Sequence, residues 1–189
     1  MTSNSSSNVN NGSAKIRILD AARTLFAEHG VAGTSLQMIA DTIGVTKAAV
    51  YHQFKAKEDI VYAVGEQINM ALDVMTEAAL KEPTPAKQRQ TLVTQIIQLA
   101  VASRKISGAL QHDPHLLRLF REQDPFKKVM DRMNNVLIGD NQTAEAKVTV
   151  AAIITCIAGA VMHPICDDVT DEELSAQLHK VVKSMIRLL

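Results

Sequence analysis

The stretch 34–57 constrains the fold of this chain more than any other. Its apolar residues recur at helical spacing in two short segments, at Leu36, Ile39, Ala40 and Ile43 and then at Val50 and Phe54. Thr34 with Gln37 three residues later predicts a capping box at the start of the first helix. Gly44 predicts the end of that helix, and Thr46 predicts the N-cap of the second. Two short helices joined by a tight, glycine-containing turn predict a helix-turn-helix.

The second helix of this motif has two different faces. Val50 and Phe54 are four residues apart and are expected to anchor the helix to a core. The remaining residues are small or able to form hydrogen bonds, which suits close approach to phosphates and base edges in a DNA major groove. An ordinary surface helix with a mixed polar face has the same pattern. The motif alone therefore leaves both interpretations open.

Four segments, 18–30, 34–40, 44–46 and 50–58, together resemble the DNA-binding domain of the TetR family of repressors, with order and spacing unbroken. The resemblance implies DNA contacts at Thr34, Ser35, Thr46, Lys47, Ala48, Ala49, Tyr51, His52 and Lys57. There are two departures from the family pattern. Ala48 and Ala49 stand where the family often has Gly-Thr or Gly-Ser, and Ala56 replaces a frequent serine N-cap, a loss of about 1 kcal/mol for the next helix.

The distribution of charge fits contact with DNA at one end of the chain. The formal net charge of the 189 residues is zero. Residues 14–57 nevertheless hold six Lys or Arg against three Asp or Glu, a net charge of +3, and the remainder of the chain carries −3. A basic head on an acidic body predicts local binding to phosphates, with the body kept away from them.

Composition predicts three parts and a cytoplasmic location. Residues 1–13 are polar, lack the apolar core of a signal peptide and are expected to be a disordered tail. Residues 14–57 form the expected DNA-binding domain, and residues 58–189 the expected ligand-binding and dimerisation domain. No apolar run reaches the roughly 18 residues of a membrane span, so we expect no membrane partner. Two cysteines, Cys156 and Cys166, suit a reducing cytoplasm.

The whole chain is predicted to be all-α, because no convincing alternation of period two occurs. Thr84-Pro85, Asp113-Pro114 and Asp124-Pro125 are predicted helix starts, and Thr170 with Glu173 predicts a second capping box. About nine helices are expected, at 14–29, 34–43, 46–54, 57–80, 85–111, 114–121, 125–138, 143–163 and 170–189. The first three form the helix-turn-helix head, and the rest form a helical body.

The last two predicted helices suggest a dimer. Between residues 148 and 162 apolar and small residues surround the helix, so both of its faces must be buried. Residues 174–189 carry a broad apolar stripe. One face can meet the core and the other a second subunit, although two helices central to one monomer core fit the same pattern. The TetR resemblance implies a homodimer built on these two helices.

The same resemblance implies a ligand cavity in the body. Its candidate lining is Leu99, Arg104, His112, Leu117, Phe120, Phe126, Met130, Met133, Asn134 and His163. Apolar walls with a few polar anchors suit a small organic effector, and aliphatic and methionine side chains favour a flexible apolar one such as an acyl chain. These residues also describe an ordinary core, and the sequence does not separate the two interpretations. No cofactor is expected.

The sequence predicts a ligand-responsive repressor that binds a palindromic operator as a dimer, and two other functions compete with this prediction. A metal-responsive repressor would use His112, His115, His163 and Cys166, which are ligand types for zinc or copper. Pro114 and Pro164 interrupt both pairs, which argues against it. An interaction module whose helix-turn-helix does not bind DNA remains open. No nucleophile elbow, phosphate-binding glycine loop or acid–base pair indicates an enzyme.

Overall fold

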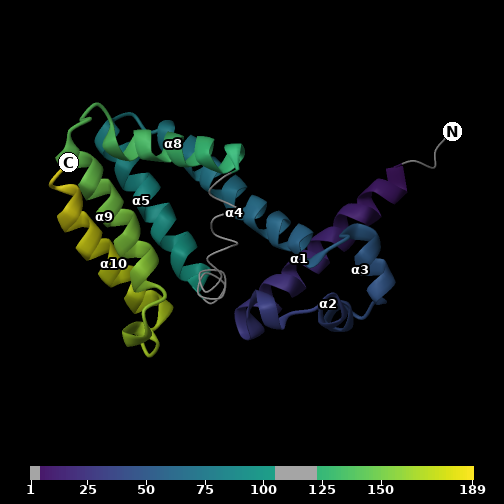
Figure 1. The fold of residues 1–189 in the computed structure, drawn as a ribbon. Coiled ribbons are helices and arrows are strands. Elements are labelled where there is room, and N and C mark those ends of the chain that lie inside the picture. The colour runs from purple at the N-terminus through teal and green to yellow at the C-terminus, as the bar shows by residue number, and fades with distance from the viewer. Residues whose placement is uncertain (1–4, 105–122) are drawn as a thin grey trace. The chain divides into compact units, whose positions relative to one another are not determined.

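A computed structural model describes residues 5–104 and 123–189, with side chains from residue 12 onward. All secondary structure within these ranges is helical (Figure 1), which confirms the all-α prediction. The elements are α1 (Ser5–Gly33), α2 (Leu36–Ile43), α3 (Lys47–Gln53), α4 (Lys57–Leu80), α5 (Pro85–Ala102), α8 (Asp124–Ile138), α9 (Ala144–Ala160), the 3-10 helix η1 (Pro164–Cys166) and α10 (Asp171–Ile186). The predicted helix 114–121 and the end of the predicted helix 85–111 lie outside the described residues.

The start of α1 differs from the prediction. The helix begins at Ser5, not at residue 14, because lengthening an existing helix avoids the cost of nucleating a new one. The predicted disorder of residues 1–13 concerns their dynamics in solution and stays a prediction. At the other end Gly30 has φ 71° and ψ 165°, which are not helical values, so the regular helix ends at the predicted glycine.

The described residues divide into two compact units. We call residues 5–67 the head, and residues 68–104 and 123–189 the body. The division falls inside α4, later than the predicted boundary after residue 57. The physical reason is that the first turns of α4 supply buried residues of the head, Ile60, Val61 and Val64.

The head is built from amphipathic helices that share one core. α1 packs against α2, and α2 packs against α3. Phe26, Ile39, Val50 and Ile60 are fully buried. Their helical spacing in the sequence is the reason that one face of each helix turns inward.

The body is built around α5, α8, α9 and α10. α10 packs against α5 and α9, and α8 packs against the same two helices. Figure 1 shows α9 and α10 side by side. The most deeply buried side chains of this core are Leu92, Ile97, Leu137, Ile153, Ile157 and Val182.

Side-chain caps fix where most body helices begin. The hydroxyls of Thr84 and Thr143 each accept a hydrogen bond from an amide three residues later. The capping box of Thr170 and Glu173 is present as predicted, and the hydrogen bonds from Thr170 lower the pKa of the Glu173 carboxyl. The predicted cap at Asp124 is wrong. Gln123 occupies the N-cap position without a side-chain hydrogen bond, and Asp124 lies in the first turn, where its charge suits the helix dipole.

Length and polarity bear on any membrane role. Within residues 5–104 and 123–189 no helix is both long enough and apolar enough to cross a membrane.

Candidate functional site

The turn between α2 and α3 is held by hydrogen bonds from three sources. Gly44 has φ 69° and ψ 38°, a left-handed conformation that only glycine adopts readily, and its N–H donates to the carbonyls that end α2. The Val45 N–H donates to the Ala40 carbonyl at 3.0 Å. From α1, Arg17 Nη2 donates to the Ile43 carbonyl at 2.8 Å. The first of these was predicted, whereas the role of Arg17 was not.

α3 is anchored on one side and free on the other. Its first turn is capped by Thr46, whose hydroxyl accepts the Ala49 N–H at 3.2 Å. Val50 is fully buried, and Phe54 is almost so. The ammonium of Lys15 lies 5.4 Å from the centroid of the Phe54 ring. These contacts fix which face of the helix points outward.

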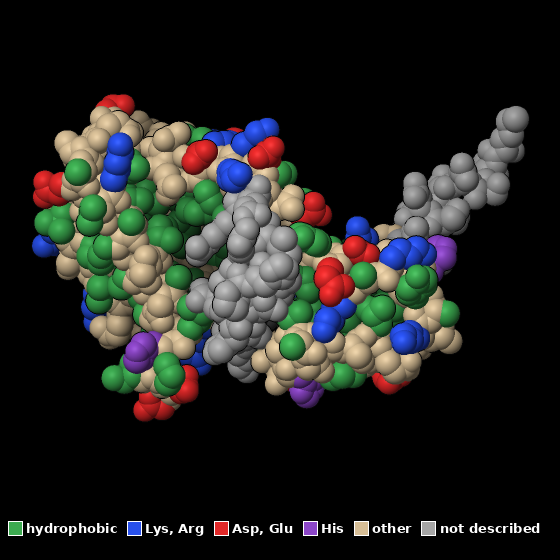
Figure 2. Space-filling model, in the orientation of Figure 1, with side chains coloured by type: hydrophobic (Ala, Val, Ile, Leu, Met, Phe, Trp, Pro, Cys, Tyr) green, Lys and Arg blue, Asp and Glu red, His purple; other side chains and the backbone are tan. Residues whose placement is uncertain are grey.

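The outward face of α3 gathers most of the predicted DNA contacts. Thr46, Lys47, Ala48, Ala49, Tyr51 and His52 are all exposed. Tyr51 keeps 51% of its surface accessible, and the Lys55 ammonium lies 4.9 Å from the centroid of its ring. Sequence analysis missed Lys55, although its spacing of four from Tyr51 is a usable signal. Figure 2 shows Lys, Arg and His side chains over the region of α3 and the neighbouring part of α1.

Thr34 and Ser35 both have structural roles that differ from the predicted capping box. Ser35 is the N-cap of α2, because its hydroxyl accepts the Met38 N–H at 3.2 Å. Thr34 is only 2% exposed, and its hydroxyl donates to the Gly30 carbonyl at 2.8 Å. The predicted capping box of Thr34 and Gln37 is therefore wrong by one residue. We retain the exposed Ser35 as a candidate DNA contact and withdraw the buried Thr34.

Lys57 is held inside the head. Its ammonium donates to the carbonyls of Val31 at 2.7 Å and Thr34 at 3.0 Å, with the Ala32 carbonyl 3.4 Å away. These bonds tie the first residue of α4 to the connection between α1 and α2. An ammonium has only three protons, so few remain for a phosphate. We therefore reassign Lys57 from a DNA contact to a positioning residue.

The missing serine before α4 is compensated locally. The Ala56 N–H donates to Asp59 Oδ2 at 2.9 Å. Asp59 and Glu58 also place negative charge in the first turn of α4, which suits the helix dipole. The departure from the family pattern at Ala56 therefore leaves this amide satisfied.

The structure describes seven of the ten predicted ligand contacts, and those seven have different surroundings. Met133 is 2% exposed within the body core, and Met130 packs against that core. Leu99, Phe126 and Asn134 are half-buried. Arg104 instead fastens the start of α10, with Nη1 donating to the Val169 carbonyl at 3.0 Å and Nε 3.0 Å from an Asp171 carboxylate oxygen. His112, Leu117 and Phe120 lie outside the described residues.

His163 is also placed differently from its prediction as a ligand contact. It is exposed, and its Nδ1 accepts the Ile165 N–H at 3.2 Å, so the ring caps η1. The metal alternative gains no support from it. Among the described residues no group of three or more His, Cys, Asp or Glu is arranged to hold an ion, and His112 and His115 fall outside those residues.

Two buried amides in the body were missed by the sequence analysis. Oδ1 of Asn69, on α4, and Oε1 of Gln95, on α5, are buried and have no hydrogen-bond partner among residues 5–104 and 123–189. A buried acceptor without a partner costs about 1–3 kcal/mol, so each is a natural anchor for a ligand that donates a hydrogen bond. The usable signal was a polar residue inside an apolar helical stripe, as at Gln95 beside Val93 and Ile96.

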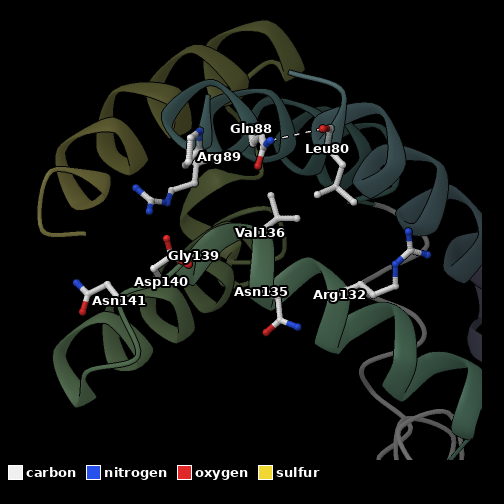
Figure 3. Close-up of a pocket in the computed structure, with 10 residues that line it drawn as sticks. Leu80, Gln88, Arg89, Arg132, Asn135, Val136, Gly139, Asp140 and Asn141 are labelled. Carbon is white, nitrogen blue, oxygen red and sulfur yellow. Dashed lines mark hydrogen bonds between the residues drawn. The ribbon is translucent and has the colours of Figure 1, made fainter. Parts of the chain in front are cut away.

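A cavity of about 570 Å³ opens in the body between the start of α5 and the end of α8. Figure 3 shows its lining residues. They are Leu80, Pro85, Gln88, Arg89, Arg132, Asn135, Val136, Gly139, Asp140 and Asn141. None of them was among the predicted ligand contacts. Its volume falls in the usual range for small-molecule sites, about 300–1,000 Å³.

The anchored and exposed α3 after a glycine turn defines a helix-turn-helix protein. Residues 18–64 match the family model described as bacterial regulatory proteins, tetR family. This match confirms the resemblance to the TetR family that the sequence predicts, and it covers the helix-turn-helix and the first turns of α4.

Curated relatives match mainly this part of the chain. The transcriptional repressor AcnR of Corynebacterium diphtheriae is 35% identical over 66 residues, 34% of this chain and 35% of AcnR. The transcriptional regulator TtgR of Pseudomonas putida is 30% identical over 103 residues, 52% of this chain and 49% of TtgR. The matched segments thus span half or less of these relatives.

Solved structures share the fold over nearly the whole chain. The regulator PfmR of Thermus thermophilus has a TM-score of 0.70 at 20% identity, covering 90% of this chain and 97% of PfmR. The regulator FadR of Bacillus subtilis, solved in complex with stearoyl-CoA, has a TM-score of 0.71 at 19% identity, covering 92% of this chain and 98% of FadR. At such identities the likeness establishes the fold alone.

Proposed function

We propose that this protein is a transcriptional repressor that binds a palindromic DNA operator as a homodimer and is released by a small apolar organic effector. The observation that carries the proposal is the outward face of α3, where Lys47, Tyr51 and His52 are exposed while Val50 anchors the opposite side. A helix fixed in this way presents its N-terminal residues to a major groove. The proposal includes a cytoplasmic location, because a repressor must reach the DNA that it binds.

Electrostatics and the relatives support the DNA-binding part. The net charge of +3 on residues 14–57 favours phosphates, and the −3 on the remainder disfavours them. AcnR is named a repressor, and TtgR a regulator. The alternative function is an interaction module whose helix-turn-helix does not bind DNA. This alternative predicts that no salt-dependent operator binding will be observed.

The first prediction concerns α3. Lys47→Ala and Tyr51→Phe should each weaken operator binding while leaving the thermal unfolding temperature nearly unchanged, because both side chains are exposed. Loss of a phosphate contact at Lys47 should lower the slope of log affinity against log salt by about one unit, whereas loss of a base contact should change sequence preference. Mobility shift over a series of salt concentrations, with operator fragments obtained by footprinting, measures both effects.

Lys87→Ala is the matched control for the first prediction. Lys87 is exposed on α5 in the body, so its removal should change operator affinity and salt slope little. Parental affinity in both α3 variants at every salt concentration would show that α3 is not the DNA-reading helix.

The outer face of α9 supports the dimer. The inner face holds buried Thr149, Val150, Ile153 and Ile157. The opposite face is exposed or half-buried at Val148, Ala151, Ala152, Thr155, Ala158, Gly159 and Met162. The segment 148–162 contains no charged residue, and Val148 is 67% exposed. Small uncharged residues allow a second helix to approach closely. The neighbouring α10 adds exposed Val181, and Leu188, just after the end of α10, is exposed as well. Two-fold symmetry through α9 and α10 would place one recognition helix at each operator half-site.

Apolar walls and the two unpaired amides support an organic effector. FadR of Bacillus subtilis was solved with stearoyl-CoA, and that ligand belongs to FadR. Here Asn69 and Gln95 offer buried acceptors beside the aliphatic core of the body. An effector can release DNA only by binding the state with low DNA affinity more tightly than the operator-bound state.

The second prediction is that organic molecules, not metals, release the operator. With a chelator present, medium- and long-chain fatty alcohols and fatty acids are titrated into the operator complex, and zinc and copper are then titrated without chelator. We expect release by at least one of the organic series and none by metals. Gln95→Leu should weaken release by the fatty alcohols while leaving operator binding intact, because it removes the oxygen that accepts a hydrogen bond from their hydroxyl group. Release by metal alone, lost in His112→Ala and His115→Ala, would overturn the organic effector.

A further inference from the structure

The cavity between α5 and α8 contains an arginine that forms no ion pair with any described residue. Arg89, on α5, lines it, and its Nε is buried without a hydrogen-bond partner. Within the described residues no hydrogen bond or ion pair satisfies its guanidinium, and an unsatisfied buried donor is unfavourable in the empty protein. A group that accepts hydrogen bonds from Arg89 would remove this cost.

Gly139 makes room for that guanidinium. It lies directly after α8 with φ +64°, and a Cβ built on it would come within 2.9 Å of Arg89 Nη2. The positive φ favours glycine at this position, and the guanidinium of Arg89 occupies the space that a side chain would otherwise take. The turn after α8 accommodates an arginine that the rest of the described chain leaves unpaired.

The second arginine of the cavity is in a different electrostatic state. Arg132 is 2.5 Å from an Asp73 carboxylate oxygen and also forms an ion pair with Glu77. Figure 3 shows Arg89 and Arg132 on opposite sides of the cavity, with Asp140 on the side of Arg89. Asp140 forms no ion pair with Arg89 in the described structure. Among the described residues that line the cavity, Arg89 is thus the cation without an ion pair, whereas Arg132 is neutralised.

We propose that this cavity binds a small organic anion, with its carboxylate or phosphate oxygens on Arg89 and its apolar part against Leu80, Pro85 and Val136. A guanidinium donates two parallel hydrogen bonds to such oxygens, which is the geometry that these anions favour. Asn135 and Asn141 also line the cavity. The Asn135 amide and the second N–H of the Asn141 amide, whose other N–H donates to the Leu189 carbonyl at 3.4 Å, can donate to further oxygens. In naming the chemical class of an effector, the inference rests on the proposed function. Binding itself does not depend on DNA.

Calorimetric titration of the DNA-free protein tests the inference with three probes that share one alkyl chain. Octanoate and octyl phosphate carry the two candidate anionic groups, and octanol is the uncharged control. We expect at least one anion to bind roughly tenfold to a hundredfold more tightly than octanol. The stronger of the two identifies the anionic group. Arg89→Gln should remove that advantage and leave octanol binding unchanged.

Two variants sharpen the result. Arg132→Gln removes a cation from the same cavity that is already paired, so it should change anion affinity by less than about threefold. Arg89→Lys keeps the charge but loses the planar fork, so it should give an affinity between those of the parent and Arg89→Gln. If Arg89→Gln fails to fold, the parent and Arg89→Lys still test whether Arg89 binds the anionic group. The measurement is then the affinity of each protein for octanoate and octyl phosphate relative to octanol.

Equal affinity for octanol and both anions would overturn the inference. An equal loss of anion affinity in Arg132→Gln and Arg89→Gln would overturn it as well. Because no DNA is present, a failure of operator binding cannot produce or hide these outcomes. Anion binding that leaves the operator complex intact would support the site and count against its role in release.

Discussion

Replacing Val181 with glutamate is expected to convert a dimer into folded monomers and to weaken operator binding by about a hundredfold or more, because two linked heads bind far more tightly than one. Val181 is 48% exposed on α10, so a carboxylate there is tolerated in the isolated subunit. At a subunit interface the same carboxylate would be buried without a partner, which is strongly unfavourable. Light scattering at micromolar concentration measures the mass, and circular dichroism checks the fold.

Two neighbours of Val181 provide controls on the same helix. Val182 is fully buried, so Val182→Glu should unfold the body and not merely separate subunits. Lys183 is exposed on the other flank of α10 from Val181, so Lys183→Glu should remain a dimer. A parent protein that is monomeric at micromolar concentration, or a Val181→Glu variant that stays dimeric, would contradict the interface.

Replacing Lys57 with methionine is expected to lower the stability of the head by about 2 kcal/mol, the scale of losing hydrogen bonds to a charged donor. The bonds lost are those to the carbonyls of Val31 and Thr34, at 2.7 and 3.0 Å. Ser35 and the start of α2 come directly after Thr34 in the chain. Loss of these bonds should therefore also disturb the helix-turn-helix and lower operator affinity. Chemical denaturation followed by circular dichroism measures the first effect, and mobility shift measures the second.

Lys55→Met is the matched control for Lys57→Met. It removes the same charge two residues away, but the ammonium of Lys55 lies over the Tyr51 ring and binds no carbonyl of the described head. The free energy of unfolding of Lys55→Met should therefore differ little from that of the parent. The two variants also distinguish the positioning role of Lys57 from a phosphate contact. A phosphate contact predicts normal unfolding of Lys57→Met with a shallower salt slope.

Local signals in the sequence were sufficient for the helix-turn-helix. Gly44 ends α2 because it adopts the left-handed conformation, and Thr46 caps α3 because its hydroxyl reaches an amide three residues on. Val50 and Phe54 are buried because helical spacing places them on one face. Each of these features depends on residues at most four positions apart, so composition and order alone determine it. The capping box at Thr170 was predictable for the same reason.

Where two neighbouring residues could each act as the N-cap of a helix, only tertiary packing determined which of them does so. Thr34 and Ser35 both carry a hydroxyl suited to an N-cap. Burial of Thr34 against the Gly30 carbonyl leaves Ser35 as the cap. At the start of α8, Asp124 could cap by its chemistry, yet the helix starts one residue earlier.

Contacts between residues far apart in the sequence were beyond prediction. Lys57 reaches carbonyls 23 and 26 residues away, and Arg104 reaches Val169, 65 residues away. From the sequence alone, a lysine or arginine is predicted to be an exposed charge on the surface. Its hydrogen-bond partner depends on how the helices pack. The same holds for the cavity at Arg89, since its walls come from the end of α4, the start of α5 and the turn after α8. The sequence by itself determined the helices and their buried faces, because those depend on local spacing. Which polar side chains remain free to bind a ligand or DNA depends on long-range packing, and only the tertiary structure decided that.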